Sequence, residues 1–306
     1  MKDIDIDGPR KEKIMFSHKS LSNILMVFFV VVFILGCNPA KNGPQTSTGP
    51  KLYLVSSDVG VGSNRIPFFI LKGDGSPLTG IDQDLLVKYY KENEDLAYKT
   101  SNTRWRPWPE KGGLYVTDMQ FLSHGLWNVK ISFGEPEQTV RSTIIVKANP
   151  DAPNLGEKAP AIKTKIVSDT NPLNTLTSDP NPDPNLYAVS LDQALRQNIP
   201  VVVTLSTPGY CQTAICGPQT KVLSDLSTYN GKNIVFIHVE IFENPHEMKI
   251  TGDPSVGVES ESVVEWGIST EPWTFLIDKH GIIKERYEGF VSKEELQDDI
   301  NTLMDK

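Results

Sequence analysis

Two runs rich in apolar and β-branched residues constrain the C-terminal part of this 306-residue chain more than any other feature. Residues 199–205 (IPVVVTL) form a continuous β-branched run, and residues 233–241 (NIVFIHVEI) form a second run that is apolar apart from Asn233, His238 and Glu240. Such runs are typical of strands covered on both faces, as in sheets that carry helices on each side. The amphipathic segment 221–229 (KVLSDLSTY) lies between them and predicts a connecting helix. Residues 186–306 are therefore expected to form an α/β domain.

Two later patterns complete the predicted domain. Residues 272–278 (PWTFLID) and 282–289 (IIKERYEG) flank a short turn around Gly281, which predicts a β-hairpin. A capping-box pattern at residues 292–295 (SKEE) then opens a final helix. The apolar residues of that helix recur at helical spacing, so they indicate one buried face: Leu296, Ile300 and Leu303.

The order of these motifs resembles the thioredoxin family. Cys216-Gly217-Pro218 matches the first three positions of the family's Cys-Gly-Pro-Cys motif, and Pro272 falls where the family keeps a cis-proline that faces the active cysteine. The resemblance implies a thioredoxin-like fold and thiol–disulfide exchange with client proteins. Two residues depart from the family: Gln219 replaces the second cysteine of the motif, and the carboxylate Glu271 precedes the proline.

A second cysteine is nevertheless available, because Cys211 lies five residues upstream of Cys216. A loop of this length can bring two Cα atoms within the roughly 4.4–6.8 Å that a disulfide needs. The exposed N–H groups of a helix start favour a thiolate. We therefore expect Cys216 to be the nucleophile and Cys211 the resolving thiol, with Pro272 shaping the client groove. Glu271 would disfavour a nearby thiolate and would suit a bound cation.

Three other interpretations of the cysteine pair stay open. A partial resemblance to Sco-type copper proteins implies a copper site with a distant histidine, here His246, because thiolates suit Cu(I) and imidazole suits either copper state. A partial resemblance to peroxiredoxins implies peroxide reduction, although Pro272 stands where those enzymes carry an arginine. The third is a structural disulfide in a non-catalytic thioredoxin-like binding module.

The N-terminus carries an apolar run at residues 24–35 (ILMVFFVVVFIL), which has the length of a signal-peptide core and is shorter than the about 20 residues of a membrane-spanning helix. The run ends in Leu35-Gly36-Cys37, which resembles a bacterial lipobox. The resemblance implies that residues 1–36 are a lipoprotein signal peptide. It also implies that Cys37 carries lipid chains, among them palmitate. An uncleaved membrane anchor is the alternative, and Met15 would give a more ordinary signal length than Met1. We expect an extracytoplasmic, lipid-anchored protein.

The rest of the chain is expected to form a tether, a second domain and a linker. Residues 37–50 are polar and rich in Pro, Gly, Ser and Thr, which is typical of a flexible tether. Residues 51–147 alternate in short runs between turn signals and predict an antiparallel, immunoglobulin-like β-sandwich. Residues 148–185 contain seven prolines and predict an extended linker or a wrapping arm. The net charge is −8 without a basic block, which argues against nucleic acid as a partner.

Overall fold

The structure is a computed structural model, and it describes residues 49–80, 84–93, 97–100, 103–108, 112–168, 171–231 and 233–305. The predicted signal peptide, the lipidation site at Cys37 and nearly all of the predicted tether lie outside these residues. No helix in the described ranges is long and apolar enough to cross a membrane.

The β-rich part, residues 51–147, consists of two sheets in its described residues. Their strand orders are β1-β3-β7-β6 and β2-β9-β8-β4-β5. All neighbours are antiparallel except β2 and β9. The strands are β1 (Lys51–Leu54), β2 (Val59–Gly60), β3 (Gly62–Leu71), β4 (Leu86–Lys91), β5 (Ala97–Thr100), β6 (Arg104–Pro107), β7 (Gly113–Phe121), β8 (Gly125–Phe133) and β9 (Gln138–Lys147).

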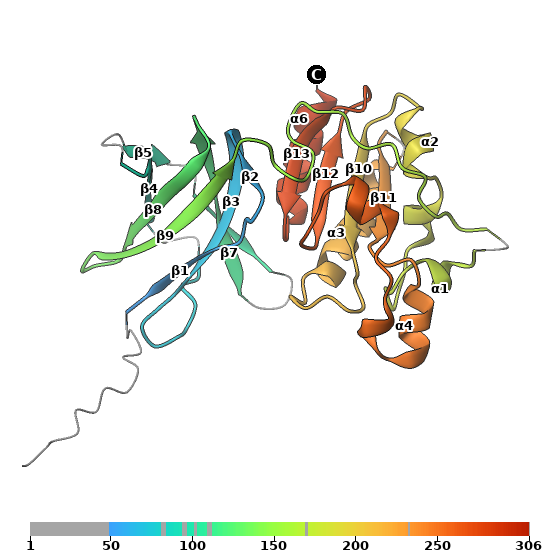
Figure 1. The fold of residues 1–306 in the computed structure, drawn as a ribbon, viewed down its shortest axis with the longest axis horizontal. Helices are drawn as coiled ribbons and strands as arrows, with labels where there is room; N and C mark the ends of the chain where they lie inside the picture. Colours follow the sequence, from blue (N-terminus) through green and yellow to red (C-terminus); the bar gives the residue numbers. More distant parts are fainter. Residues whose placement is uncertain are drawn as a thin grey trace, which may run out of the picture. The chain divides into compact units, whose positions relative to one another are not determined.

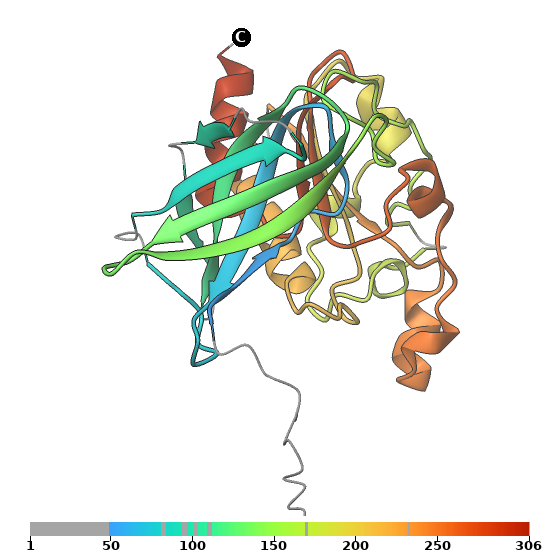
Figure 2. The ribbon, with the colours of Figure 1, turned by 60° about the vertical axis from the view of Figure 1, so that its left-hand side comes forward.

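One apolar core lies between these two sheets. Ile66 and Phe68 of β3 are fully buried, as are Val129 and Ile131 of β8 in the other sheet, and all four belong to the same cluster. Their spacing of two residues follows from the alternation of side chains along a strand. Figure 2 shows the green strands of one sheet in front of the blue strand β3. The β-rich character predicted for this part is confirmed, while its immunoglobulin-like topology stays a prediction.

The α/β part, residues 186–305, has the element order that the sequence predicts. Its four-stranded sheet runs in the order β11-β10-β12-β13, with β10 and β11 parallel and the other neighbours antiparallel. Helix α3 connects the two parallel strands along the sequence and is labelled in Figure 1. The elements are β10 (Val201–Ser206), α3 (Cys216–Asn230), β11 (Val235–Glu240), β12 (Trp273–Ile277), β13 (Ile283–Glu288) and α6 (Lys293–Met304).

Both faces of this sheet are buried, which explains the unbroken apolar run in β10. Val201, Val203 and Leu205 join a cluster on one face that includes α2 (Leu191–Leu195) and Val263 of α5 (Glu261–Glu265). Val202 points to the other face, where its cluster includes Val222, Leu223 and Leu226 of α3 and Leu296 and Ile300 of α6. The β10 strand therefore needs apolar side chains in both directions.

The proline-rich segment before the α/β part packs against it. The backbone of Ala159 donates to the carbonyl of Gly281, and Ile283 donates to the carbonyl of Glu157. Leu176 of this segment is buried in the cluster that includes residues of α3 and α6. The segment includes α1 (Leu173–Leu176) and the 3-10 turn η1 (Pro184–Tyr187). Of the two forms expected for this segment, these contacts match a wrapping arm.

The β-rich part and the α/β part belong to one compact unit, residues 47–306. Buried ion pairs connect them. The Arg65 guanidinium binds the Glu295 carboxylate with two bonds, 2.8 Å from Nε to Oε1 and 2.9 Å from Nη2 to Oε2. Arg286 Nη2 lies 2.6 Å from Asp58 Oδ2. Both pairs are less than one-tenth exposed.

Candidate functional site

Cys211 and Cys216 form a disulfide whose Cα atoms are 5.9 Å apart, inside the range expected from the sequence. Cys216 is the first residue of α3, and Cys211 belongs to the loop that joins β10 to that helix. The backbone N–H of Ala214 donates to the carbonyl of Cys211, so the loop curls back between the two cysteines.

The two cysteines of this disulfide differ in exposure. Cys216 is completely buried, whereas Cys211 is half-buried and is flanked by the exposed residues Gln212 and Thr213. The Cys211 sulfur lies 3.2 Å from the Thr213 hydroxyl. A thiol arriving from solution therefore reaches Cys211 before Cys216.

The start of helix α3 provides a polar environment for the Cys216 sulfur. The helix is 15 residues long, and its N-cap residue Ile215 makes no side-chain capping bond. Helix N-termini carry unpaired N–H groups and a partial positive charge, which stabilise an anion. Gln219, at the position of the family's second cysteine, is buried and accepts a hydrogen bond of 2.9 Å from the Val291 N–H. This hydrogen bond connects α3 to the segment before α6.

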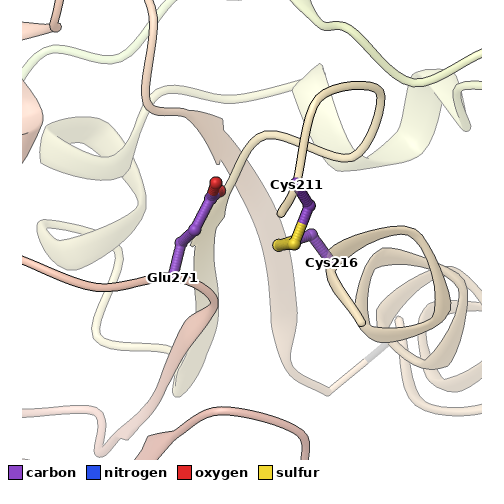
Figure 3. A group of neighbouring side chains, drawn as sticks. All are labelled: Cys211, Cys216 and Glu271. Carbon is purple, nitrogen blue, oxygen red and sulfur yellow. A yellow bond between two sulfur atoms is a disulfide. The ribbon is translucent and has the colours of Figure 1, made fainter. Parts of the chain in front are cut away.

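Pro272 and Glu271 form the opposite wall of the site. The peptide bond between them is cis, as the resemblance implied, and Pro272 is buried just before β12. The Glu271 carboxylate accepts a hydrogen bond of 2.5 Å from the Thr207 N–H and lies beside the disulfide (Figure 3). One carboxylate oxygen and the two sulfurs all lie within 4.8 Å of one another.

The environment of Glu271 favours its neutral form. Burial raises the pKa of this carboxyl to about 7, and the nearby Glu240 carboxyl adds to the increase. The hydrogen bond from Thr207 acts in the opposite direction but is weaker. Burial also raises the pKa of Glu240. The disulfide therefore faces a carboxyl that titrates near neutral pH.

A buried polar chain leads from the sheet to α3. His238 of β11 is bonded at both ring nitrogens, 2.7 Å from the Tyr187 hydroxyl and 2.9 Å from the Ser206 hydroxyl. Ser206 is 3.4 Å from the hydroxyl of Thr220, which donates to the carbonyl of Cys216. Burial lowers the pKa of His238 to about 4, so the imidazole is neutral at physiological pH. These contacts describe a histidine that is part of the sheet's internal packing.

A groove of about 630 Å³ opens beside the Cys211 loop. Tyr210 lines one side of it, whereas Trp273 is buried against Phe275. The described charged residues in the groove wall are both carboxylates, Glu259 and Glu271. Its apolar surface comes from Ile241, Phe242, Val263 and Ile268.

His246 does not join the cysteines in this structure. Among the described residues, the group of potential ligands close enough to share one ion is Cys211, Cys216 and Glu271. His246 lies in α4 (Pro245–Thr251), where Nε2 is 4.0 Å from a Glu247 carboxylate oxygen and Nδ1 is buried without a hydrogen-bond partner. Sequence reasoning noted that Glu271 would suit a cation, but it offered His246 as the third copper ligand.

Comparisons with known proteins find distant similarity to solved structures alone. No protein-family model matches the chain, and no curated protein matches it. A thioredoxin-family thiol:disulfide interchange protein from Chlorobium tepidum is 12% identical, with a TM-score of 0.34 over 50% of this chain and 99% of the other. The exposed lipoprotein thioredoxin of Streptococcus pneumoniae is 15% identical, with a TM-score of 0.28 over 36% and 90%. Likenesses this distant assign no activity.

Proposed function

We propose that this protein exchanges disulfides with client proteins through the Cys211–Cys216 pair. The observation that carries the proposal is the asymmetry of the disulfide: Cys211 is a partly exposed residue whose chain neighbours line an open groove, and Cys216 is buried at a helix start. A purely structural disulfide has no need of an adjacent groove.

The burial of the two sulfurs gives each one a role. A client thiolate attacks Cys211 Sγ, the bond between the two cysteines breaks, and Cys216 leaves as a thiolate stabilised by the N–H groups of α3. A second client thiol then attacks the client sulfur of the mixed disulfide, which releases Cys211. The client loses two electrons and two protons, and the pair gains them as two thiols. The reverse sequence reduces a client.

These roles are the reverse of those expected from the sequence, which made Cys216 the nucleophile. In the reduced protein, Cys211 is the thiol that can reach a client disulfide, and Cys216 is the thiol that resolves the intermediate. The Glu271 side chain lies across from the disulfide, and the cis bond joins it to Pro272, so we assign this segment to the passage of a client.

We further propose that the chain works outside the cytoplasm, held to a membrane by a lipid on Cys37. The support is the lipobox-like sequence that ends in Gly36-Cys37. Lipidation with two or more chains anchors a protein stably. Extracytoplasmic compartments let cysteine pairs persist as disulfides, so this location supplies the oxidised form that the exchange requires.

A kinetic experiment tests the exchange. The purified oxidised chain is mixed with a reduced peptide that carries two cysteines, and samples are alkylated at intervals and weighed by mass spectrometry. We expect the peptide to become oxidised while the chain gains two alkylatable thiols, at a rate well above that of the peptide alone in air. A chain that gains no thiols under these conditions contradicts the proposed function.

A further inference from the structure

We infer that reduction of the Cys211–Cys216 disulfide creates a binding site for a borderline divalent cation such as Zn²⁺, with Cys211, Cys216 and Glu271 as its ligands. The inference goes beyond the proposed exchange, since it requires only that the disulfide can be reduced. Nothing about client proteins enters it.

The geometry brings together three ligands from three separate elements. Cys211 comes from the loop after β10, Cys216 from the first turn of α3, and Glu271 from the segment before β12. Their two sulfurs and one carboxylate oxygen lie within 4.8 Å of one another (Figure 3). Ligands of one zinc ion bind at about 2.0–2.3 Å, so atoms this close need only small side-chain movements to share it.

The charges of the reduced site favour a cation. Breaking the disulfide places two thiols beside Glu271, and the next buried ionisable group that acts on Glu271 is another carboxyl, Glu240. The described charged residues of the adjoining groove are also acidic. No described lysine or arginine lines that groove. A bound divalent cation would therefore supply the positive charge that two thiolates and a carboxylate need.

The ligand set indicates which class of metal binds. Zinc accepts both thiolate sulfur and carboxylate oxygen, and zinc sites with three protein ligands keep a fourth position open. Calcium and magnesium prefer oxygen ligands, and Cu(I) prefers thiolates and thioethers without a hard carboxylate. Two thiolates and one carboxylate therefore match zinc better than copper, the metal considered from the sequence.

The redox step that opens the site balances as follows. A reductant of the phosphine class gives two electrons to the disulfide, the bond between the sulfurs breaks, and two protons from water complete the thiols. The phosphine takes an oxygen from water and becomes a phosphine oxide. Zinc then displaces the two thiol protons and the proton of the neutral Glu271 carboxyl, and buffer accepts all of them. In the oxidised chain both sulfurs are bonded to each other, and neither is available as a thiolate.

The test compares zinc retention by the oxidised and the phosphine-reduced full chain. Each form is loaded with Zn²⁺ and passed through a desalting column, and the retained metal is measured with a chromogenic chelator. We expect about one zinc per reduced chain and none on the oxidised chain. Co²⁺ in place of zinc should give thiolate-to-metal absorption in the reduced chain only, which reports sulfur ligation directly.

Two matched variants test the carboxylate. Glu271→Gln keeps an oxygen that can accept the Thr207 N–H but removes the charge, and Glu261→Gln removes an exposed carboxylate at the start of α5, outside both the groove and the ligand cluster. We expect Glu271→Gln to weaken zinc binding by about 10-fold or more, because even the loss of an outer-shell partner costs about 10–100-fold. Glu261→Gln should bind as the parent chain does.

The outcomes separate this inference from the proposed function. A reduced chain that retains no zinc, or a Glu271→Gln variant that binds zinc as tightly as the parent, overturns the three-ligand site. The dithiol-peptide assay on the same preparations reports exchange independently. Zinc binding without exchange contradicts the proposed function and leaves the metal site standing, whereas exchange without zinc binding does the opposite.

Discussion

At the scale of single residues, the two cysteines differ in burial and in position, and these differences lead to a trapping experiment. Replacing the resolving thiol leaves the attacking thiol joined to its client, because nothing inside the protein can displace it. With Cys211 accessible and Cys216 fully buried, we expect Cys216→Ser to accumulate a stable mixed disulfide with a peptide disulfide. Cys211→Ser should accumulate at least about 10-fold less.

The adducts are counted by non-reducing mass spectrometry after equal incubation. Single Cys→Ser changes also remove the disulfide, so the urea midpoints of both variants serve as a control for loss of fold. If Cys211→Ser traps the peptide and Cys216→Ser does not, the roles assigned from burial are wrong and those expected from the sequence are right.

His238 gives a prediction about pH. Burial lowers its pKa from 6.5 to about 4, so the folded protein binds this proton less readily than the unfolded chain. The stability associated with neutral His238 is complete above pH 6.5 and is lost as the pH falls toward 4, by about 3 kcal/mol at most. As the pH falls from 6.5 to 4, the free energy of unfolding of the parent chain should therefore decrease more than that of His238→Gln.

Urea unfolding at pH 7, 5.5 and 4 measures that difference. His280→Gln is the matched control, because His280 is exposed in the hairpin turn between β12 and β13. Parallel curves of stability against pH for the parent and His238→Gln would show that His238 does not titrate as described.

Part of the site could be predicted from single residues, and part could not. The sequence placed Cys216 at a helix start and Pro272 after a cis bond, because both belong to local motifs. It could not show which cysteine is more exposed, because that depends on the conformation of the loop of residues 207–215, which joins β10 to α3. The sequence placed Glu271 near the reactive thiol through its position before the family's cis-proline, but it gave no means to place His246 apart from the cysteines.

At the scale of elements, the groove beside the disulfide leads to a prediction about clients. Its charged residues are Glu259 and Glu271 in the described part of the wall, and its remaining surface is largely apolar. We expect a peptide disulfide flanked by lysines to react about 10-fold faster than one flanked by glutamates at low salt. High salt should reduce this ratio, because it screens exposed charges.

Stopped-flow exchange with the two peptides measures the ratio. Glu259→Gln should lower it, while Glu261→Gln, an exposed carboxylate at the start of α5 outside the groove, should leave it unchanged. Equal rates for both peptides with the parent chain would contradict a role for the groove in choosing clients.

The elements of the α/β part differ in how far the sequence predicted them. Strands β10 and β11 were predictable because their apolar runs match a sheet that is buried on both faces. The connection at residues 242–268 was not, because it is polar and has no clear period. In the structure it contains α4, the 3-10 turn η2 (Pro254–Val256) and α5, and it supplies one wall of the groove.

At the scale of the whole molecule, Arg65 and Glu295 join the β-rich part to the α/β part. Burial raises the pKa of Glu295, but the hydrogen bonds and charge of Arg65, together with the charges of Arg106 and Arg104, lower it below its ordinary value. Arg106 lies 3.5 Å from the same carboxylate. Removing one member of a buried pair leaves an uncompensated charge, so Glu295→Ala should cost about 3–5 kcal/mol of unfolding free energy.

The matched control is Asp225→Ala, which breaks an exposed pair with Lys221 inside α3 and should cost less than about 1 kcal/mol. Urea denaturation of both variants gives the comparison. Equal costs would mean that the contact between the two parts contributes no more than a surface pair. This contact could not be predicted from the sequence, because Arg65 and Glu295 lie 230 residues apart and neither belongs to a recognisable motif.

The redox equilibrium of the whole chain tests the central claim most directly. The protein is equilibrated across a series of dithiol and glutathione buffers, alkylated, and weighed to count free thiols. We predict a single two-electron transition of the Cys211–Cys216 pair between about −120 and −270 mV, the range of known exchange proteins. A disulfide that stays closed far below that range, or a pair that never closes within it, would contradict disulfide exchange as the function of this protein.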